Sequence, residues 1–363
     1  MNGTDLYALV ERYHGFGIHR AGTDGDRATV EWYGNELEQR GLVVEHQPVT
    51  FDRYVADSVL MADGEAIDHL PLPYEWTGSI DTTDIDVVLA DANAGGRDDD
   101  LDDALSRSGD ALVIATAHPE GSLVALNRDP EDRGGHPTVL VAGRDHARLA
   151  AASTRHLRLD ARIESAATTN LFAHRPGVDP ADAMLLTTPL TGWFGCAGER
   201  GTGAAVLLDL VERLTERPIV VLATGAHELE YLGVARWVEA TSFRPRAIVH
   251  VGASVAVDAP DENGTRRLVP TRLAMTDQSG ADADAIARAL EPASFQFRPD
   301  TSAWLGESEV FCALGVPMIS FTGSGVDFHT PEDTPERATS PDSLATVAAA
   351  IADAAEALWI ATA

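Results

Sequence analysis

The chain has 363 residues, 44% of them hydrophobic, which is enough apolar material for one large domain with an insertion or for two domains. Its 57 acidic and 27 basic residues give a formal net charge of −30, and every basic residue is an arginine. Such a surface repels phosphate backbones and anionic lipids, so we expect no nucleic-acid partner and no membrane partner. The acidic, lysine-free composition fits a salt-adapted or a GC-rich source.

The cysteines and the start of the chain indicate a cytoplasmic protein. The sequence contains only Cys196 and Cys312, no basic segment followed by an apolar segment opens it, and no apolar run approaches membrane-spanning length. We therefore expect two free thiols. Cys196 lies close to Glu199, and it is either a small buried hydrophobe, a nucleophile or a fourth metal ligand.

The residue pattern of the first half of the chain changes near residue 52. Apolar spacing and Arg40-Gly41 predict a helix over 27–41, and alternation predicts a strand over 42–51. Beyond them, short β-like runs at 87–89, 111–115 and 138–141 are separated by turn-rich, acidic segments such as 95–103. This pattern predicts a smaller β-rich domain at 53–167, inserted into a main domain formed by 1–52 and 168–363.

A strand and helix alternation returns after residue 168. Expected strands lie at 184–188, 219–223, 247–251 and 316–321, and expected helices at 203–214, up to about 239, at 281–290 and at 343–360. Alternation of this kind predicts an α/β fold of three layers, with a mostly parallel central sheet covered by helices on both faces. The alanine-rich last helix is expected to be buried or to form an oligomer contact, so a homo-oligomer is possible.

Three residues with metal-ligand chemistry stand at the ends of these elements. Glu199 precedes the helix at 203–214, Glu228 follows the strand at 219–223, and His329 follows the strand at 316–321. Ligands bind beyond the carboxyl ends of the strands in sheets of this type. Two carboxylates and one imidazole suit one divalent ion, Zn²⁺, Mn²⁺ or Fe²⁺, with an open coordination position, so a catalytic metal is expected.

The same segments carry a family resemblance. They read RAGTDGD at 20–26, GTG at 201–203, GAHELEYLG at 225–233 and FHTPEDT at 328–334. Together with the order of the elements, they resemble the di-zinc aminopeptidases and glutaminyl cyclases of metallopeptidase clan MH. The insert at about 53–167 is similar to the protease-associated domain of that family, and the resemblance covers nearly the whole chain.

The chain departs from the family pattern at one of the two metals. The family holds its first metal by a His-x-Asp motif and by an Asp after a later strand, where this chain has Pro189-Leu-Thr191 and Gly252. The family's bridging Asp is Glu199 here, and its Glu-Glu pair is His227-Glu228. The resemblance therefore implies that the first-metal ligands are missing and that a single metal remains, as in the glutaminyl cyclases.

The resemblance also places His227 where the family has the general base. An imidazole can take a proton from water at neutral pH, so His227 is a candidate catalytic base; it could instead be a fourth ligand or a structural residue. Trp193, Phe194 and Trp304 lie in predicted loops near the site and are candidates for stacking on a planar substrate, with ordinary packing as the alternative. His250 is expected to be structural.

These residues point to three classes of function. The leading one is a single-metal hydrolase of a C–N bond, amide or amine, in a small molecule, including hydrolytic deamination, with metal-activated water as the nucleophile. The second is a catalytically inactive aminopeptidase relative that acts as a binding or assembly module. The third is an aminopeptidase or a glutaminyl cyclase.

Overall fold

The computed structural model describes residues 1–91, 105–106, 109–131 and 134–362, so the acidic run at 95–103 lies outside the described residues. The helices are α1 (Gly3–His14), α2 (Asp24–Gln39), α4 (His146–Ala151), α5 (Thr202–Arg213), α6 (Leu232–Ala240), α7 (Gly280–Leu290), α8 (Ser308–Phe311), α9 (Pro335–Ala338) and α10 (Pro341–Ala361). The strands are β1 (Val43–Ala62), β2 (Glu65–Ala66), β3 (His69–Pro71), β4 (Gly78–Thr82), β5 (Ile85–Asp91), β6 (Ala111–Ala117), β7 (Thr138–Ala142), β8 (Arg155–His174), β9 (Met184–Pro189), β10 (Ile219–Thr224), β11 (Ala247–Val251), β12 (Asp258–Pro260), β13 (Arg266–Leu268), β14 (Leu273–Thr276), β15 (Gln296–Arg298) and β16 (Met318–Thr322).

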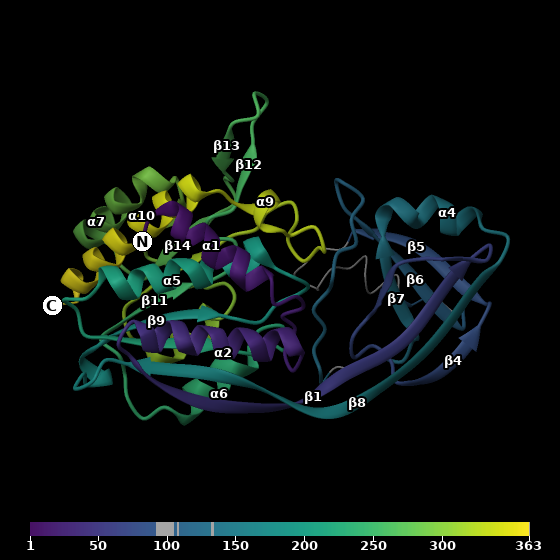
Figure 1. The fold of residues 1–363 in the computed structure, drawn as a ribbon, viewed down its shortest axis with the longest axis horizontal. Helices are drawn as coiled ribbons and strands as arrows, with labels where there is room; N and C mark the ends of the chain where they lie inside the picture. The colour runs from purple at the N-terminus through teal and green to yellow at the C-terminus, as the bar shows by residue number, and fades with distance from the viewer. Residues whose placement is uncertain (92–104, 107–108, 132–133, 363) are drawn as a thin grey trace.

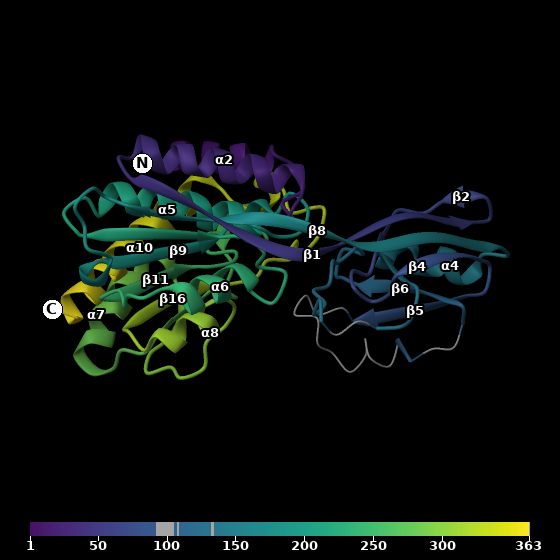
Figure 2. The ribbon, with the colours of Figure 1, turned by 90° about the horizontal axis from the view of Figure 1, so that it is seen from below.

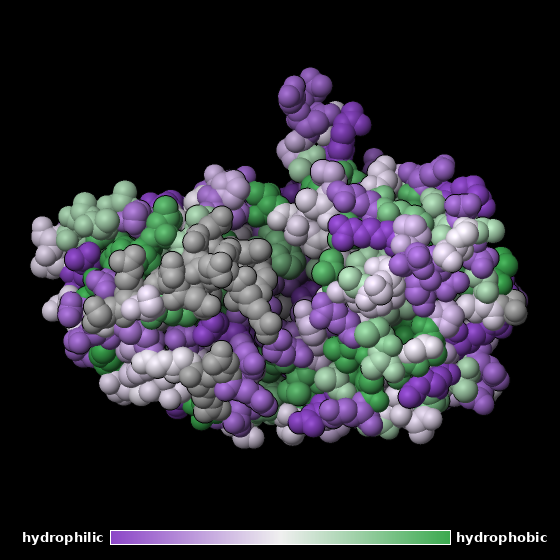
Figure 3. Space-filling model, turned by 180° about the vertical axis from the view of Figure 1, so that it is seen from behind, coloured by the Kyte–Doolittle hydropathy of each residue, from purple (hydrophilic) through white to green (hydrophobic). Residues whose placement is uncertain are grey.

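Two larger sheets organise these strands (Figure 1). The main sheet has ten strands in the order β15-β14-β16-β11-β9-β10-β8-β1-β2, with β4 paired to β8, and its centre from β16 to β10 is parallel. The smaller sheet has the order β3-β7-β6-β5. The hydrophilic hairpin of β12 and β13 projects from the surface (Figure 3).

Helices cover both faces of the main sheet (Figure 2). In β9, Met184 and Leu186 belong to the core cluster shared with α1, α2, α5, α7 and α10, whereas Leu185 belongs to the cluster shared with α6 and α8. Successive side chains of a strand point to opposite faces, and both faces are covered, which explains why β9 is buried along its whole length. The predicted three-layer α/β fold is confirmed.

Most of the predicted elements of the main part agree with the structure to within a few residues. The strand predicted at 247–251 has the same bounds as β11, and the helix predicted at 203–214 is α5. Sequence reasoning did not anticipate α1, and it ended the first strand at residue 51, although β1 continues to Ala62. Pairing with β8 explains the difference, because every residue of β1 has a partner on that strand.

The β1–β8 ladder also connects the two parts of the molecule. It runs without a break from Val43 opposite His174 to Ala62 opposite Arg155, and Figure 1 shows the two strands passing from the main sheet to the smaller one. The predicted domain boundaries, between 52 and 53 and between 167 and 168, fall within this ladder. The assignment of 53–167 as a separate domain stays a prediction.

Helix α10 closes the main core. By length and composition alone it is apolar enough to cross a membrane, with 56% of its apolar window buried inside the protein. Leu344, Val347, Ile351 and Leu358 are fully buried among the residues of the main core cluster. This is the packing of a core helix, and it agrees with the buried helix predicted from the sequence.

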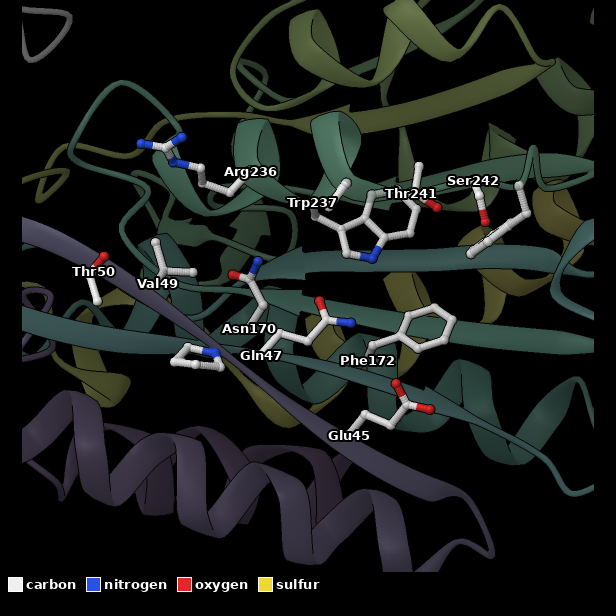
Figure 4. Close-up of a pocket in the computed structure, with 13 residues that line it drawn as sticks. Glu45, Gln47, Val49, Thr50, Asn170, Phe172, Arg236, Trp237, Thr241 and Ser242 are labelled. Atoms are coloured by element: carbon white, nitrogen blue, oxygen red, sulfur yellow. The ribbon is translucent and has the colours of Figure 1, made fainter.

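Asn170 of β8 fixes the start of the loop that follows β10. Its side-chain oxygen accepts a hydrogen bond from the Gly225 N–H (3.0 Å), and its nitrogen donates one to the Gly233 carbonyl (2.8 Å). Figure 4 shows Asn170 at the edge of a groove that is also lined by Phe172 and Trp237. Because one side chain holds both ends of the segment 225–233, it sets the position of the residues between them.

Replacing Asn170 by Ala should destabilise the protein by about 1–3 kcal/mol for each buried backbone group left unpaired. The measurement is the free energy of unfolding in urea. Gln47, opposite Asn170 on β1, is half-buried and provides the matched control as Gln47→Ala. Equal losses for the two variants would contradict the role given to Asn170.

Asp26 of α2 is a buried carboxyl group that ties the helix to the sheet. It accepts hydrogen bonds from the Gly22 N–H (2.7 Å) and from the Thr168 hydroxyl on β8 (2.9 Å). Burial raises the pKa of Asp26 to about 6, although these two hydrogen bonds oppose the shift. The folded protein therefore binds this proton more tightly than the unfolded chain does.

The contribution of Asp26 to stability should fall as the pH rises from about 4 to about 6, because ionising the carboxyl group is harder in the folded state. The free energy of unfolding of the wild type relative to Asp26→Asn should therefore drop by on the order of 2–3 kcal/mol between pH 4 and pH 7. Urea unfolding at the two pH values measures it. Asp24→Asn, in the exposed first position of the same helix, is the control. A difference that does not change with pH would contradict the shifted pKa.

Candidate active site

The candidate residues gather at the carboxyl edge of the parallel strands. Non-glycine residues with positive φ concentrate in the loops there: Phe194 (55°) and Cys196 (27°) after β9, Ala226 (54°) after β10, Ser254 (54°) after β11 and His329 (60°) after β16. Such conformations are uncommon for residues with a side chain and persist where the surrounding structure imposes them. Their position at one edge of the sheet marks the expected ligand-binding crevice.

Glu199 and His329 meet at this edge, as the sequence predicted. Glu199 lies in the single π-helical turn Ala197–Gly201 and is 1% exposed. Its Oε1 lies 3.2 Å from Nε2 of His329 and 2.9 Å from Nη2 of Arg200. Burial alone would raise the pKa of Glu199, but the charge interactions with His329 and Arg200 lower it to about 2. The carboxylate is therefore ionised.

Asp333 fixes the turn that carries Glu199. Its two carboxyl oxygens accept the backbone N–H groups of Gly198 (2.7 Å) and Glu199 (2.9 Å). Burial raises the pKa of Asp333 to about 7, against these two hydrogen bonds. Asp333 belongs to the FHTPEDT motif at 328–334, but no sequence pattern predicts this contact.

Glu228 makes its hydrogen bonds to residues other than Glu199 and His329. Its Oε1 accepts the Ala21 N–H (2.5 Å) and its Oε2 accepts the Thr191 hydroxyl (2.8 Å). Burial raises its pKa, and these donors together with the charge of Arg20 oppose the shift. The side chain predicted as the third ligand is thus engaged by protein donors on both oxygens.

His227 forms a buried pair with Glu307, a residue that sequence reasoning missed. Its Nδ1 lies 3.0 Å from Oε1 of Glu307, and Glu307 also accepts the hydroxyl of Thr224 at 2.8 Å. Glu307 is fully buried, and the side chain of His227 is 13% exposed. Burial, followed by the charge of Arg200, lowers the pKa of His227 well below its ordinary value, so the imidazole is neutral. The position of Glu307 before the short helix α8 carries no recognisable motif.

The three aromatic candidates lie in different surroundings. Trp193 is 4% exposed, donates to Asn127 Oδ1 (2.8 Å) and lies 6.5 Å from His329, measured between ring centroids. Phe194 is half-buried beside Trp193. Trp304 is half-buried against the α6 and α8 cluster. Trp193 is therefore at the site by direct contact, and the substrate-binding role of all three stays a prediction.

The segment 118–127 covers the site. The backbone of Ala125 pairs with His329, since its N–H donates to the His329 carbonyl (2.8 Å) and its carbonyl lies 3.1 Å from Nδ1 of the imidazole. His118 Nε2 lies 2.6 Å from the Val326 carbonyl, and Asn127 contacts Trp193. A part of the chain predicted to belong to the inserted domain thus lies over the predicted catalytic loop.

Two other candidates from the sequence are buried. Cys196 is fully buried 3.4 Å from the Tyr13 hydroxyl, and burial raises the pKa of its thiol, which is the behaviour of a small hydrophobe rather than a nucleophile. Cys312 is exposed, and both cysteines are free thiols. His250 is 2% exposed; burial lowers its pKa to about 4. The nearby charge of Glu307 opposes that shift without overcoming it.

These contacts decide how well the residues fit a metal ion. In the described part of the chain, no group of three or more His, Cys, Asp or Glu side chains could hold one. Glu199 and His329 provide two donors, but the guanidinium of Arg200 lies against the same carboxylate oxygen. Glu228 does not join them. The predicted three-ligand arrangement is therefore not assembled, and a divalent ion does not fit the site as the structure has it.

Comparisons with known proteins agree with the architecture. No curated protein matches the chain significantly. Among solved structures, BSAP, a zinc aminopeptidase from Bacillus subtilis, is 17% identical with a TM-score of 0.74, over 97% of this chain and 94% of that one. A peptidase M28 precursor from Shewanella amazonensis SB2B is 20% identical with a TM-score of 0.69, over 97% and 92%. A glutaminyl cyclase from Porphyromonas gingivalis is 13% identical with a TM-score of 0.51, over 98% of each chain.

At these identities the neighbours establish the fold, and the family follows from the sequence itself. The sequence model of peptidase family M28 matches residues 171–355, which include the loops that carry Glu199, His227 and His329. The match supports the prediction of a hydrolase of the aminopeptidase and glutaminyl cyclase class. The chain belongs to peptidase family M28.

Proposed function

We propose that this member of a hydrolase family cleaves a C–N bond, amide or amine, in a small molecule, with His227 as the general base. The observation that carries the proposal is the pairing of His227 Nδ1 with Glu307 at 3.0 Å, at the carboxyl edge of the parallel strands. A base held in place by a second group is the recurring arrangement in proton-transfer catalysis.

The chemistry assigned to the pair follows from its contacts. In the proposed tautomer the Nδ1–H of His227 donates a hydrogen bond to Oε1 of Glu307, which leaves Nε2 as the basic nitrogen. In the proposed reaction Nε2 takes a proton from water while the water oxygen bonds to the substrate carbon, and the imidazolium returns that proton to the departing nitrogen. Glu307, held by Thr224, stabilises the imidazolium that forms in between.

The divalent ion expected from the sequence is not part of this proposal. BSAP is named as a zinc aminopeptidase, so a metal is what this neighbour suggests. Here Glu228 is held by Ala21 and Thr191, and no three-ligand group is present among the described residues. The positive charge beside Glu199 comes instead from Arg200.

The cover over the site supports a small substrate. Ala125 pairs with the backbone and imidazole of His329, and Asn127 binds Trp193, so segment 118–127 restricts the approach of a folded or extended polypeptide. The chain also carries a formal charge of −30, which disfavours polyanionic substrates. A neutral or cationic small molecule fits both observations.

A second candidate function is a binding module without turnover. It is favoured by the capture of both Glu228 oxygens by protein donors, because a side chain predicted to serve in catalysis is used there to hold the loop of Ala21 and Thr191 in place. Such a protein would bind a ligand at the same crevice and leave it unchanged.

Replacing His227 by Asn, or Glu307 by Gln, should lower the turnover of any substrate by about 10²- to 10⁴-fold, the usual contribution of a positioned base. The assay is a panel of small amides, dipeptides, an amino-terminal glutaminyl peptide and planar amines, read by mass spectrometry. His156→Asn, on the exposed pair with Asp81, is the control and should leave turnover unchanged.

The outcome separates the two candidates. Turnover that survives in both the His227 and the Glu307 variants would contradict the assigned base. Panel compounds that stabilise the wild type against heat but are never converted would support the binding module instead.

A further inference from the structure

We infer that Arg200 is the resident cation of this site and takes the place that a divalent metal ion would occupy beside Glu199. The inference deepens the proposed function, because it concerns the charge at the same site. Its test reads metal content and thermal stability, neither of which requires turnover.

The first support is the position of the guanidinium. Nη2 of Arg200 and Nε2 of His329 lie 2.9 and 3.2 Å from one carboxylate oxygen, Oε1 of Glu199. A metal ligated by that oxygen would lie about 2.0–2.2 Å from it, in the region that Nη2 already approaches. Two cations on one oxygen repel each other, and this repulsion is strong in a buried site. The guanidinium therefore weakens the binding of a metal ion at this oxygen.

The second support is that Arg200 is buried and held by defined contacts. The residue is 2% exposed, and its Nε donates to the Thr191 carbonyl at 2.9 Å. Gly192 makes room for it, because a Cβ there would lie 3.1 Å from Cγ and 3.3 Å from Nε of Arg200. A guanidinium is always protonated in proteins, so the group carries its charge at this position. The side chain is fixed in place and is not a surface arginine that happens to reach inward.

The third support comes from Thr191, which holds the remaining predicted ligand away. Its hydroxyl donates to Oε2 of Glu228 (2.8 Å) and accepts the backbone N–H of His227 (2.9 Å). The other oxygen of Glu228 accepts the Ala21 N–H. For Glu228 to reach a metal beside Glu199, both of these buried contacts would have to break. The same residue, Thr191, thus anchors the arginine and removes a ligand.

Arg200 and Glu199 still have polar atoms that can bind a ligand. Nη1 of Arg200 and both carboxylate oxygens of Glu199 have no hydrogen-bond partner within the described residues, although Oε1 is close to two charged groups. Buried groups of this kind are normally satisfied, so each is expected to bind water or a polar small molecule. The pair therefore offers one donor atom and two acceptor atoms to a polar ligand.

The experiment uses the full chain, produced in medium supplemented with zinc, manganese and iron and purified without chelator. Elemental analysis should find far less than one metal ion per chain, and neither EDTA nor added zinc should shift the thermal midpoint. A resident ion would raise the midpoint by several degrees, so the two cases are well separated. A wild type that carries about one ion per chain and loses stability in EDTA would overturn the inference.

Arg200→Met tests the substitution directly, since it removes the charge at similar length and leaves Glu199 facing His329. We expect a lower thermal midpoint that added zinc partly restores. Arg272→Met is the matched control: Arg272 is equally buried, but it donates to the Val255 and Ala293 carbonyls, so zinc should not restore that variant. Equal restoration of both variants, or of neither, would contradict the place given to Arg200.

If Arg200→Met does not fold, Glu199→Gln decides the question. A chain that uses Arg200 as its cation has no metal to lose, so the metal content of Glu199→Gln should equal that of the wild type. A metal present in the wild type and lost in this variant would overturn the inference. A wild type that is metal-free but hydrolyses none of the panel would leave the inference standing and count against the proposed function alone.

Discussion

The buried carboxylate of Glu199 sets the main constraint on the site. An ionised group that is 1% exposed needs a compensating charge at short range, and removing that charge is strongly destabilising. Here Arg200 and His329 lie close to the carboxylate. Asp333 accepts the backbone N–H groups of the turn that carries Glu199. Residues with positive φ lie in the neighbouring loops at the same edge of the sheet. The polar atoms that remain without a hydrogen-bond partner after this charge is balanced are those that a ligand can bind.

The ladder of β1 and β8 imposes a second constraint, at longer range. The two strands pair along their whole length, so the part of the chain between them is held by a twisted ribbon rather than by a free linker. Two further contacts, Ala125 with His329 and Asn127 with Trp193, hold the segment between these strands against the loops of the main part. The loop of His329 is thus contacted by a segment that lies outside the matched region 171–355.

Hydrophobic periodicity was sufficient to predict the layers and most helices. Strands buried on both faces appear in the sequence as short apolar runs, and helices with one buried face appear as apolar residues at helical spacing. Periodicity also placed Glu199 and His329 at the same edge. It could not predict where Glu228 points, since that depends on the backbone of Ala21, which lies 207 residues away. Glu307 was missed for a similar reason: its role comes from a contact with His227 across 80 residues, and no local pattern records such a contact.

Thr191 shows how these separate features form one unit. Its carbonyl accepts from Arg200, its hydroxyl donates to Glu228, and the same hydroxyl accepts from the backbone of His227. Residues that share a hydrogen-bonded network are energetically coupled, so the positions of Arg200, Glu228 and the backbone of His227 depend on one another. The hydroxyl of Thr191 donates a hydrogen bond to Glu228, which is therefore engaged by this residue and not by a cation beside Glu199. A guanidinium beside Glu199 then supplies the charge that the carboxylate still requires. The residues at which the chain departs from the family pattern are thus linked by contacts through Thr191.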